Sequence, residues 1–266
     1  MIRLITTIIL AIGIVSGVWA SSVSSFQWGV WVVTGLGLWE FGRLVLKPHI
    51  YERTVQWILG MALCGALLWR QNLELVLLVA IFGMFISFLL VMWRADPLAE
   101  AVHRLGLILL GIFYLSVTLP FWAWLKNFPA GAPWVFLALF PACLTDTFAF
   151  LVGNSIGKKK FAPRLSPNKT WEGFFGALLG AVAGTWVVKQ WFLPELAWRH
   201  WVTLSAGLWL IASLGDLAES LIKRSVGAKD ASRLIPGHGG VLDRLDALIF
   251  AAPFVYGYAK FVMHAW

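Results

Sequence analysis

The chain of 266 residues has few charged residues and few cysteines, and it shows no internal repeat or low-complexity tract. Lys, Arg, Asp and Glu make up 13% of the residues, about half the share of a soluble domain, while 60% are hydrophobic. This balance excludes a soluble globular protein and indicates a protein that crosses a bilayer several times. The two cysteines, Cys64 and Cys143, lie in apolar runs, which indicates buried small side chains rather than a disulfide or a metal site.

Apolar segments long enough to cross a bilayer, which takes about 20 residues, recur along the whole chain. The first resembles a signal peptide, but residues 19–22 form a poor cleavage site and another span follows at once, so we expect a retained helix. The sequence predicts an all-α, polytopic integral membrane protein, with about five spans in an N-terminal region, 1–130, and the rest in a C-terminal catalytic membrane domain, 131–266. The predicted spans are about nine transmembrane helices, at roughly 3–20, 26–46, 55–69, 72–93, 105–125, 134–153, 171–193, 201–223 and 247–264.

Positive charge alternates from one connecting loop to the next. The loops after the second, fourth, sixth and eighth spans carry several lysines and arginines, whereas the others carry at most one each. The positive-inside rule places the basic loops and the N-terminus in the cytoplasm. The two most basic loops, 154–170 and 224–246, therefore face the compartment that holds nucleotides. The net charge of +8 follows from this topology, so nucleic acid is not expected as a partner.

Carboxylates within apolar spans need an explanation, because an ionised side chain at membrane depth costs roughly 2.5–3.5 kcal/mol. Asp146 lies in the sixth predicted span and Asp216 in the eighth. Asp216, Glu219, Ser220 and Lys223 follow the spacing i, i+3, i+4, i+7 and should share one helix face. Pairing with a neighbouring Lys or Arg is one explanation for these acids, and a ligand or metal site is the other.

A second pair of acids follows the basic loop after the eighth span. Asp243 and Asp246 are three residues apart and would point the same way if a helix begins there. Together with Asp216 they form a set of oxygen ligands of the kind that Mg²⁺ prefers, completed by substrate phosphates. The sequence therefore predicts a divalent-cation site held by Asp216, Asp243 and Asp246.

Glycines surround the one histidine of this loop, His238. Gly239 and Gly240 permit positive φ and a close approach of the backbone to a ligand, and their amides could bind an anion. An ordinary flexible loop is the alternative, and the flanking Asp, Arg and Lys residues weaken it.

The loop 154–170 carries three consecutive lysines, 158–160, which are typical of a solvated cytoplasmic face. The segment Ser166–Thr170 opens the seventh predicted helix, and a helix N-terminus binds anions. Lys169 and Thr170 would suit a phosphate there. The segment is not a Walker A loop, because the glycine-rich lead is absent. Cations, carboxylates and a cytoplasmic location together indicate phosphoryl or nucleotidyl transfer assisted by Mg²⁺.

Two motifs carry a family resemblance. Residues 220–246 read Ser-x2-Lys-Arg-x4-Lys-Asp-x-Ser-x2-Ile-Pro-x-His-Gly-Gly-Val-x-Asp-Arg-Leu-Asp, and residues 166–173 read Ser-Pro-x-Lys-Thr-Trp-Glu-Gly. The first resembles, without departure, the signature of the phosphatidate cytidylyltransferase (CDP-diacylglycerol synthase) family, and the segment 146–173, which contains the second, also resembles that family. Phe148 departs locally, because many members have a small residue there, which affects the packing beside Asp146. The resemblance is close over the C-terminal half.

The resemblance implies a reaction in which CTP and phosphatidic acid give CDP-diacylglycerol, the activated precursor for phospholipid synthesis, and pyrophosphate. It implies Mg²⁺, as one or two metal ions, the lipid bilayer as surroundings, a multi-pass protein of the cell (inner) membrane with a cytoplasmic active site, and a homodimer. The catalytic candidates are Asp216, Lys223, Arg224, His238, Asp243 and Asp246. The candidates for binding substrate are Asp146, Ser166, Lys169, Thr170, Ser220, Lys229, Gly239, Gly240 and Arg244.

Three other functions fit the composition less well. A CDP-alcohol phosphatidyltransferase would need an Asp-Gly-x2-Ala-Arg motif, which the chain does not have. A lipid or polyprenol kinase would differ in the phosphate that it transfers. A transporter of anionic solutes would place its polar groups near the bilayer midplane within repeats, whereas the charges of this chain gather toward one membrane face.

Overall fold

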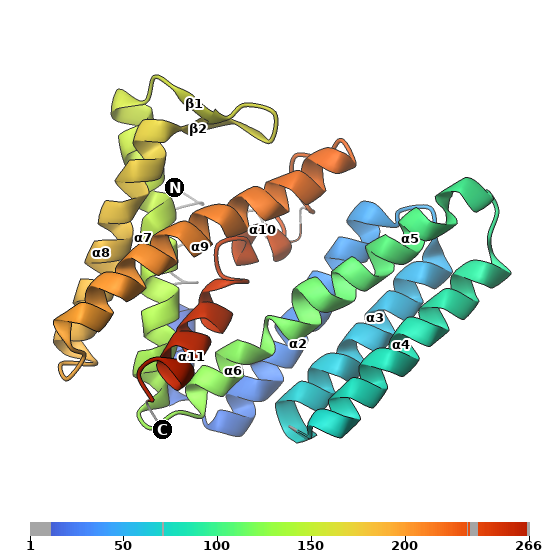
Figure 1. Ribbon diagram of the computed structural model, residues 1–266, viewed down its shortest axis with the longest axis horizontal. Coiled ribbons are helices and arrows are strands. Elements are labelled where there is room, and N and C mark those ends of the chain that lie inside the picture. Colours follow the sequence, from blue (N-terminus) through green and yellow to red (C-terminus); the bar gives the residue numbers. More distant parts are fainter. Residues whose placement is uncertain (1–11, 71, 233, 235–238, 265–266) are drawn as a thin grey trace. The chain divides into compact units, whose positions relative to one another are not determined.

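The computed structural model describes residues 12–70, 72–232, 234 and 239–264, and these residues are mostly helical (Figure 1). They form two compact units. The first comprises Met1–Ala123 and Asp230–Asp243, and the second comprises Trp124–Lys229 and Arg244–Trp266. The segment 230–243 thus groups with the N-terminal helices, although it lies in the region that the sequence assigns to the catalytic domain.

The first unit is an assembly of helices. The polar Ser22 begins α2 by accepting a hydrogen bond from the Ser25 amide, and a buried ion pair of 2.9 Å between Glu52 and Arg104 joins α3 to α5. Leu38 and Phe41 of α2 are fully buried in its core. The elements are α2 (Val23–Val45), α3 (Ile50–Gly65), the π-helix η1 (Ala66–Arg70), α4 (Leu73–Trp93), α5 (Leu98–Gly111) and the π-helix η2 (Ile112–Val117), followed by α6 (Pro120–Lys126), which leads into the second unit.

The second unit consists of long helices and one hairpin. Its elements are α7 (Gly131–Ile156), β1 (Lys160–Ala162), β2 (Ser166–Thr170), α8 (Trp171–Trp191), α9 (Trp198–Ser225) and α11 (Ala251–Phe261); the short α10 (Leu242–Leu245) straddles the boundary between the units. The strands β1 and β2 pair antiparallel, with Lys160 opposite Thr170. The hairpin corrects the all-α expectation locally, because the segment Ser166–Thr170 is a strand and α8 begins only at Trp171.

Glycines bring α7 and α8 into close contact. A Cβ at Gly176 would lie 2.5 Å from the Val152 Cβ, and one at Gly184 would lie 2.6 Å from the Pro141 Cα. Small residues at spacings of four let helices of membrane proteins approach closely, and Gly180 completes the same stripe. The contact fixes the separation of the two helices that flank the candidate site.

Five helical segments in the described part of the chain are long and apolar enough to cross a membrane: Leu73–Trp93, Leu98–Lys126, Gly131–Ile156, Trp171–Trp191 and Trp198–Ser225. These confirm a helical, membrane-type chain. The other predicted spans are not confirmed. Half of the first, residues 3–11, falls outside the described residues, and the last corresponds to α11, whose 11 residues would extend about 16 Å, short of a bilayer core of about 30 Å.

Candidate active site

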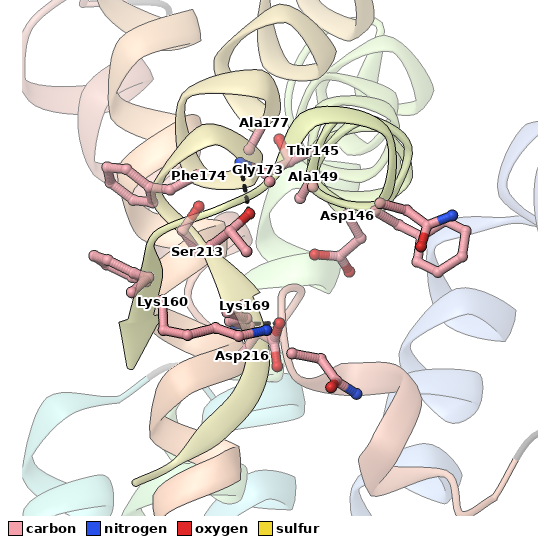
Figure 2. Close-up of a pocket in the computed structure, with 17 residues that line it drawn as sticks. Thr145, Asp146, Ala149, Lys160, Lys169, Gly173, Phe174, Ala177, Ser213 and Asp216 are labelled. Atoms are coloured by element: carbon pink, nitrogen blue, oxygen red, sulfur yellow. Dashed lines mark hydrogen bonds and ion pairs between the residues drawn. The ribbon is translucent and has the colours of Figure 1, made fainter. Parts of the chain in front are cut away.

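A cavity of about 610 Å³ lies in the second unit, bordered by α7, α8, α9 and the hairpin (Figure 2). Its charged lining comprises two lysines and two aspartates, Lys160, Lys169, Asp146 and Asp216. The remaining lining residues are Thr145, Ala149, Phe150, Gly153, Asn154, Gly157, Phe161, Asn168, Thr170, Gly173, Phe174, Ala177 and Ser213. Three of the predicted substrate-binding residues, Asp146, Lys169 and Thr170, are therefore brought together with the predicted metal ligand Asp216.

An ion pair crosses the lining of this cavity. The Lys169 ammonium of β2 lies 2.5 Å from Oδ2 of Asp216 on α9, and about a quarter of each side chain is exposed. The dashed line in Figure 2 marks this contact. Both charges therefore remain accessible to a ligand, and either could exchange its present partner for a phosphate or a cation.

The start of α8 is fixed by the residue that precedes it. The Thr170 hydroxyl accepts a hydrogen bond of 3.1 Å from the Gly173 amide, which makes Thr170 the N-cap. Glycine is required nearby, because a Cβ at Gly157 would come within 2.6 Å of the Thr170 hydroxyl. Strand β2 therefore places Lys169 and Thr170 at the start of α8, beside the cavity. Ser166, at the other end of β2, does not line the cavity.

The predicted polar face on the eighth span lies within the single helix α9, which confirms the helical spacing of its four residues. Glu219 is fully buried, and its carboxylate lies 2.5 Å from the Lys223 ammonium. Ser220 is buried on the same helix. Lys223, one of the catalytic candidates, is thus the ion-pair partner of a buried acid.

Asp246 follows α10 and packs against α9. A Cβ at Gly215 would lie 2.6 Å from the Asp246 carbonyl oxygen, so the backbone of Asp246 contacts the residue next to Asp216. Burial, followed by the negative charge of Asp216, raises the pKa of Asp246 to about 6, although the Ala247 amide, Lys223 and Arg244 act in the opposite direction. Two carboxylates are thus held near one another. Among the described residues no group of three or more His, Cys, Asp or Glu side chains is spaced to hold a metal.

The first unit holds the other predicted ligand, Asp243. Its buried carboxylate accepts hydrogen bonds from the Gly240 amide, at 2.8 Å, and from the Ala231 amide, at 3.0 Å. Gly239 has a φ of +82°, and a Cβ there would lie 2.8 Å from the Asp243 Oδ2, so only glycine fits. The prediction of positive φ in this glycine pair is confirmed at Gly239. His238 lies outside the described residues.

The remaining predicted cations differ in their surroundings. Arg224 donates from Nε to the Leu165 carbonyl, at 3.1 Å, and from Nη1 to the Ala228 carbonyl, at 2.9 Å, so it ties the end of α9 to the hairpin. Lys229 and Arg244 are exposed. Sequence reasoning did not single out Asn154, Asn168 or Lys160 as lining residues. Lys160 and Asn168 lie on the hairpin, which no local pattern indicated, and Asn154 lies on α7.

Comparison with known proteins gives consistent results. The model of the cytidylyltransferase family matches residues 1–262. A protein of Haemophilus influenzae named phosphatidate cytidylyltransferase is 30% identical over 98% of this chain and 99% of its own length. One of the same name from Pseudomonas aeruginosa is 33% identical over 94% of this chain and 93% of its own length. A third, from Brucella abortus, is 48% identical over 112 residues, which is 42% of this chain and 41% of the relative.

Proposed function

Because the chain belongs to the cytidylyltransferase family, we propose that it converts CTP and phosphatidic acid to CDP-diacylglycerol and pyrophosphate. The observation that carries the proposal is the cavity in which Lys169 and Thr170 meet Asp216 beside the start of α8. The motif at residues 166–173 supplies Lys169 and Thr170, and Asp216 lies four residues before the motif at residues 220–246. A pocket with accessible charges of both signs suits a substrate phosphate together with a cation.

The reaction needs little general-base assistance. A phosphomonoester has a second pKa of about 6, so the phosphate of phosphatidic acid is largely ionised near neutral pH. One of its oxygens forms a bond to the α-phosphorus of CTP, and the bond from that phosphorus to the β-phosphate oxygen breaks, with its electron pair leaving on pyrophosphate. Two polyanions must approach in line, so the protein must neutralise charge and hold both substrates in position.

The basic residues would supply that neutralisation. Lys169 and Thr170 would contact a phosphate beside the start of α8, with Ser166 further along the same strand. Lys223, Arg224, Lys229 and Arg244 would neutralise the triphosphate and the leaving pyrophosphate. Of these, Lys169 and Lys223 are paired with carboxylates, so phosphate binding would replace or share those contacts. His238 would donate to a phosphate oxygen or to the leaving group.

Mg²⁺ fits the acidic residues of the second unit. Asp216 and Asp246 provide oxygen donors, and a cation would stabilise the ionised form of Asp246, whose pKa is raised first by burial and then by the negative charge of Asp216. A site of two carboxylates suffices, because Mg²⁺ commonly takes one or two from the protein and completes its shell with water and substrate phosphates. Asp243 stays a predicted ligand. When bound, the ion would neutralise charge on the phosphates of the nucleotide.

The membrane arrangement is part of the proposal. We infer about nine spans, a cytoplasmic N-terminus and an active site on the cytoplasmic side of the cell (inner) membrane, supported by the alternation of basic loops along the sequence. The diacyl chains would stay in the bilayer while the phosphate reaches the protein. A homodimer is also proposed, on the family resemblance alone.

Labelled CTP tests the activity. The purified protein in vesicles that contain phosphatidic acid should transfer label to lipid from CTP labelled at the α-phosphate, and release label as pyrophosphate from CTP labelled at the γ-phosphate. A lipid kinase would give the reverse pattern, with the γ-label in lipid. Absence of lipid label from α-labelled CTP, in the presence of Mg²⁺, would refute the proposed reaction.

A further inference from the structure

Glu40 is a carboxylate in the C-terminal part of the apolar helix α2, and it is fully buried. Its Oε1 accepts hydrogen bonds from the Ser232 hydroxyl, at 2.5 Å, and from the Val241 amide, at 3.0 Å. Its Oε2 accepts a hydrogen bond of 2.7 Å from the Leu242 amide. Both oxygens therefore bind groups of the segment 230–243, about 200 positions away along the sequence.

The fit around Glu40 is tight. A Cβ at Gly240 would lie 2.7 Å from the Glu40 Oε2 and 2.9 Å from the Ser232 hydroxyl, so the carboxylate occupies the space that any larger residue would need. Hydrogen bonds to an ionised carboxylate are stronger than neutral ones, and a buried donor that loses its acceptor is costly. Glu40 thus provides a fixed acceptor for backbone groups that would otherwise be buried without a partner.

The contacts of Glu40 are adjacent to those of Asp243. Val241 and Leu242, whose amides bind Glu40, lie between Gly240 and Asp243, which bind one another. The carboxylates of Glu40 and Asp243 therefore accept hydrogen bonds from neighbouring amides of one short stretch of backbone. Displacement of the Val241–Leu242 backbone would displace Asp243 with it.

We propose that Glu40 is a positioning residue that holds Ser232, Val241 and Leu242 in place and thereby sets the orientation of Asp243. Its link to catalysis rests on the proposed function, in which Asp243 serves the reaction, whereas its link to the backbone does not. Residues that orient metal ligands or catalytic groups through hydrogen bonds typically change affinity or activity by about 10–100-fold when they are replaced.

Amide hydrogen exchange tests the structural part. In the Glu40→Ala variant the peptide that contains Val241 and Leu242 should exchange at least tenfold faster, while exchange in α7 and α8 stays at its wild-type rate. The matched control is Ser87→Ala, which removes another buried hydrogen bond of the first unit, from the Ser87 hydroxyl to the Gly83 carbonyl. Wild-type exchange at this peptide in the Glu40→Ala variant would overturn the proposal.

Kinetics test the catalytic part. The milder Glu40→Gln variant keeps the size of the side chain but offers only one acceptor oxygen, and it decides the matter if Glu40→Ala does not fold. It should lower kcat about 10–100-fold and raise the Mg²⁺ concentration that gives half-maximal rate, with the KM for CTP little changed. A merely structural role would lower the amount of folded enzyme and leave these constants at their wild-type values, as expected for Ser87→Ala. Normal kcat and Mg²⁺ dependence in Glu40→Gln would refute the role in positioning. Failure of the wild-type protein to label lipid would refute the proposed function instead, and the exchange result would still stand.

Discussion

The separation of α7 and α8 controls the cavity, and replacement of Gly176 by alanine should test this directly. The new Cβ would lie 2.5 Å from the Val152 Cβ and 2.7 Å from its Cγ2, against about 3.4 Å for ordinary contact. Rotation of the Val152 side chain cannot relieve the first contact, because Cβ does not move with χ1. The helices must shift, and overpacking of this kind costs about 1–3 kcal/mol. Alanine regains about 1 kcal/mol in a helix interior, so we expect a net loss of about 0–2 kcal/mol, whereas the same replacement at an open position should stabilise the helix.

The same shift should affect activity, because Gly173 and Ala177 on either side of Gly176 line the cavity. A displacement of about 1 Å can cost on the order of 100-fold in rate, so kcat/KM should fall by about 10–100-fold. The control is Gly257→Ala in α11, where a Cβ would meet nothing within 4 Å. Thermal unfolding in detergent and the labelled-CTP assay give the two measurements. A Gly176→Ala variant as stable and as active as Gly257→Ala would refute the reasoning.

Three further predictions concern the charged residues. Lys169→Met should raise the KM for CTP or phosphatidic acid at least tenfold. Because Lys169 and Asp216 form one ion pair, the loss of kcat/KM in a double variant with Asp216→Asn should be smaller than the two single losses combined. Additive losses in this double-mutant cycle would contradict the prediction. Asp246→Asn should require more Mg²⁺ for half-maximal rate, whereas near-normal turnover across a Mg²⁺ titration would remove Asp246 from the metal site. Arg224→Lys should speed hydrogen exchange in the hairpin, since one ammonium cannot reproduce the planar fork that reaches Leu165 and Ala228, and unchanged exchange would show that the arginine does not hold the hairpin.

Helical periodicity predicted the long elements well. The face of Asp216, Glu219, Ser220 and Lys223 lies on α9 as the spacing indicated, because the positions of side chains along one helix depend only on local geometry. The family resemblance was confirmed as well. The hairpin was missed, since strand β2 consists of Pro167 and four polar residues and has no alternating pattern, while its pairing with β1 depends on contacts that no single segment encodes.

Glu40 shows where local reasoning stops. A carboxylate in an apolar helix was a visible signal of the same kind as Asp146 and Asp216, and the cost of burying a charge should have marked it as well. Its partners could not be deduced, because Ser232 and Leu242 are about 200 residues away and the sequence around them does not indicate a hydrogen-bond acceptor on α2. The stripe of Gly176, Gly180 and Gly184, in contrast, is readable as a helix contact from its spacing alone.

The partners of a buried carboxylate indicate what it can do. Glu40 accepts hydrogen bonds from two backbone amides and a hydroxyl. Releasing these donors would leave them buried without an acceptor, so the Glu40 side chain can only hold this backbone in position. Asp216 is held by the ammonium of Lys169, a flexible side chain at an accessible cavity, so it can exchange that partner for a cation at small cost. Asp243 differs from both, because its carboxylate accepts hydrogen bonds from the amides of Gly240 and Ala231, beside the backbone that Glu40 holds. In the proposed function Asp243 would serve as a metal ligand, so the orientation of this ligand would depend on Glu40.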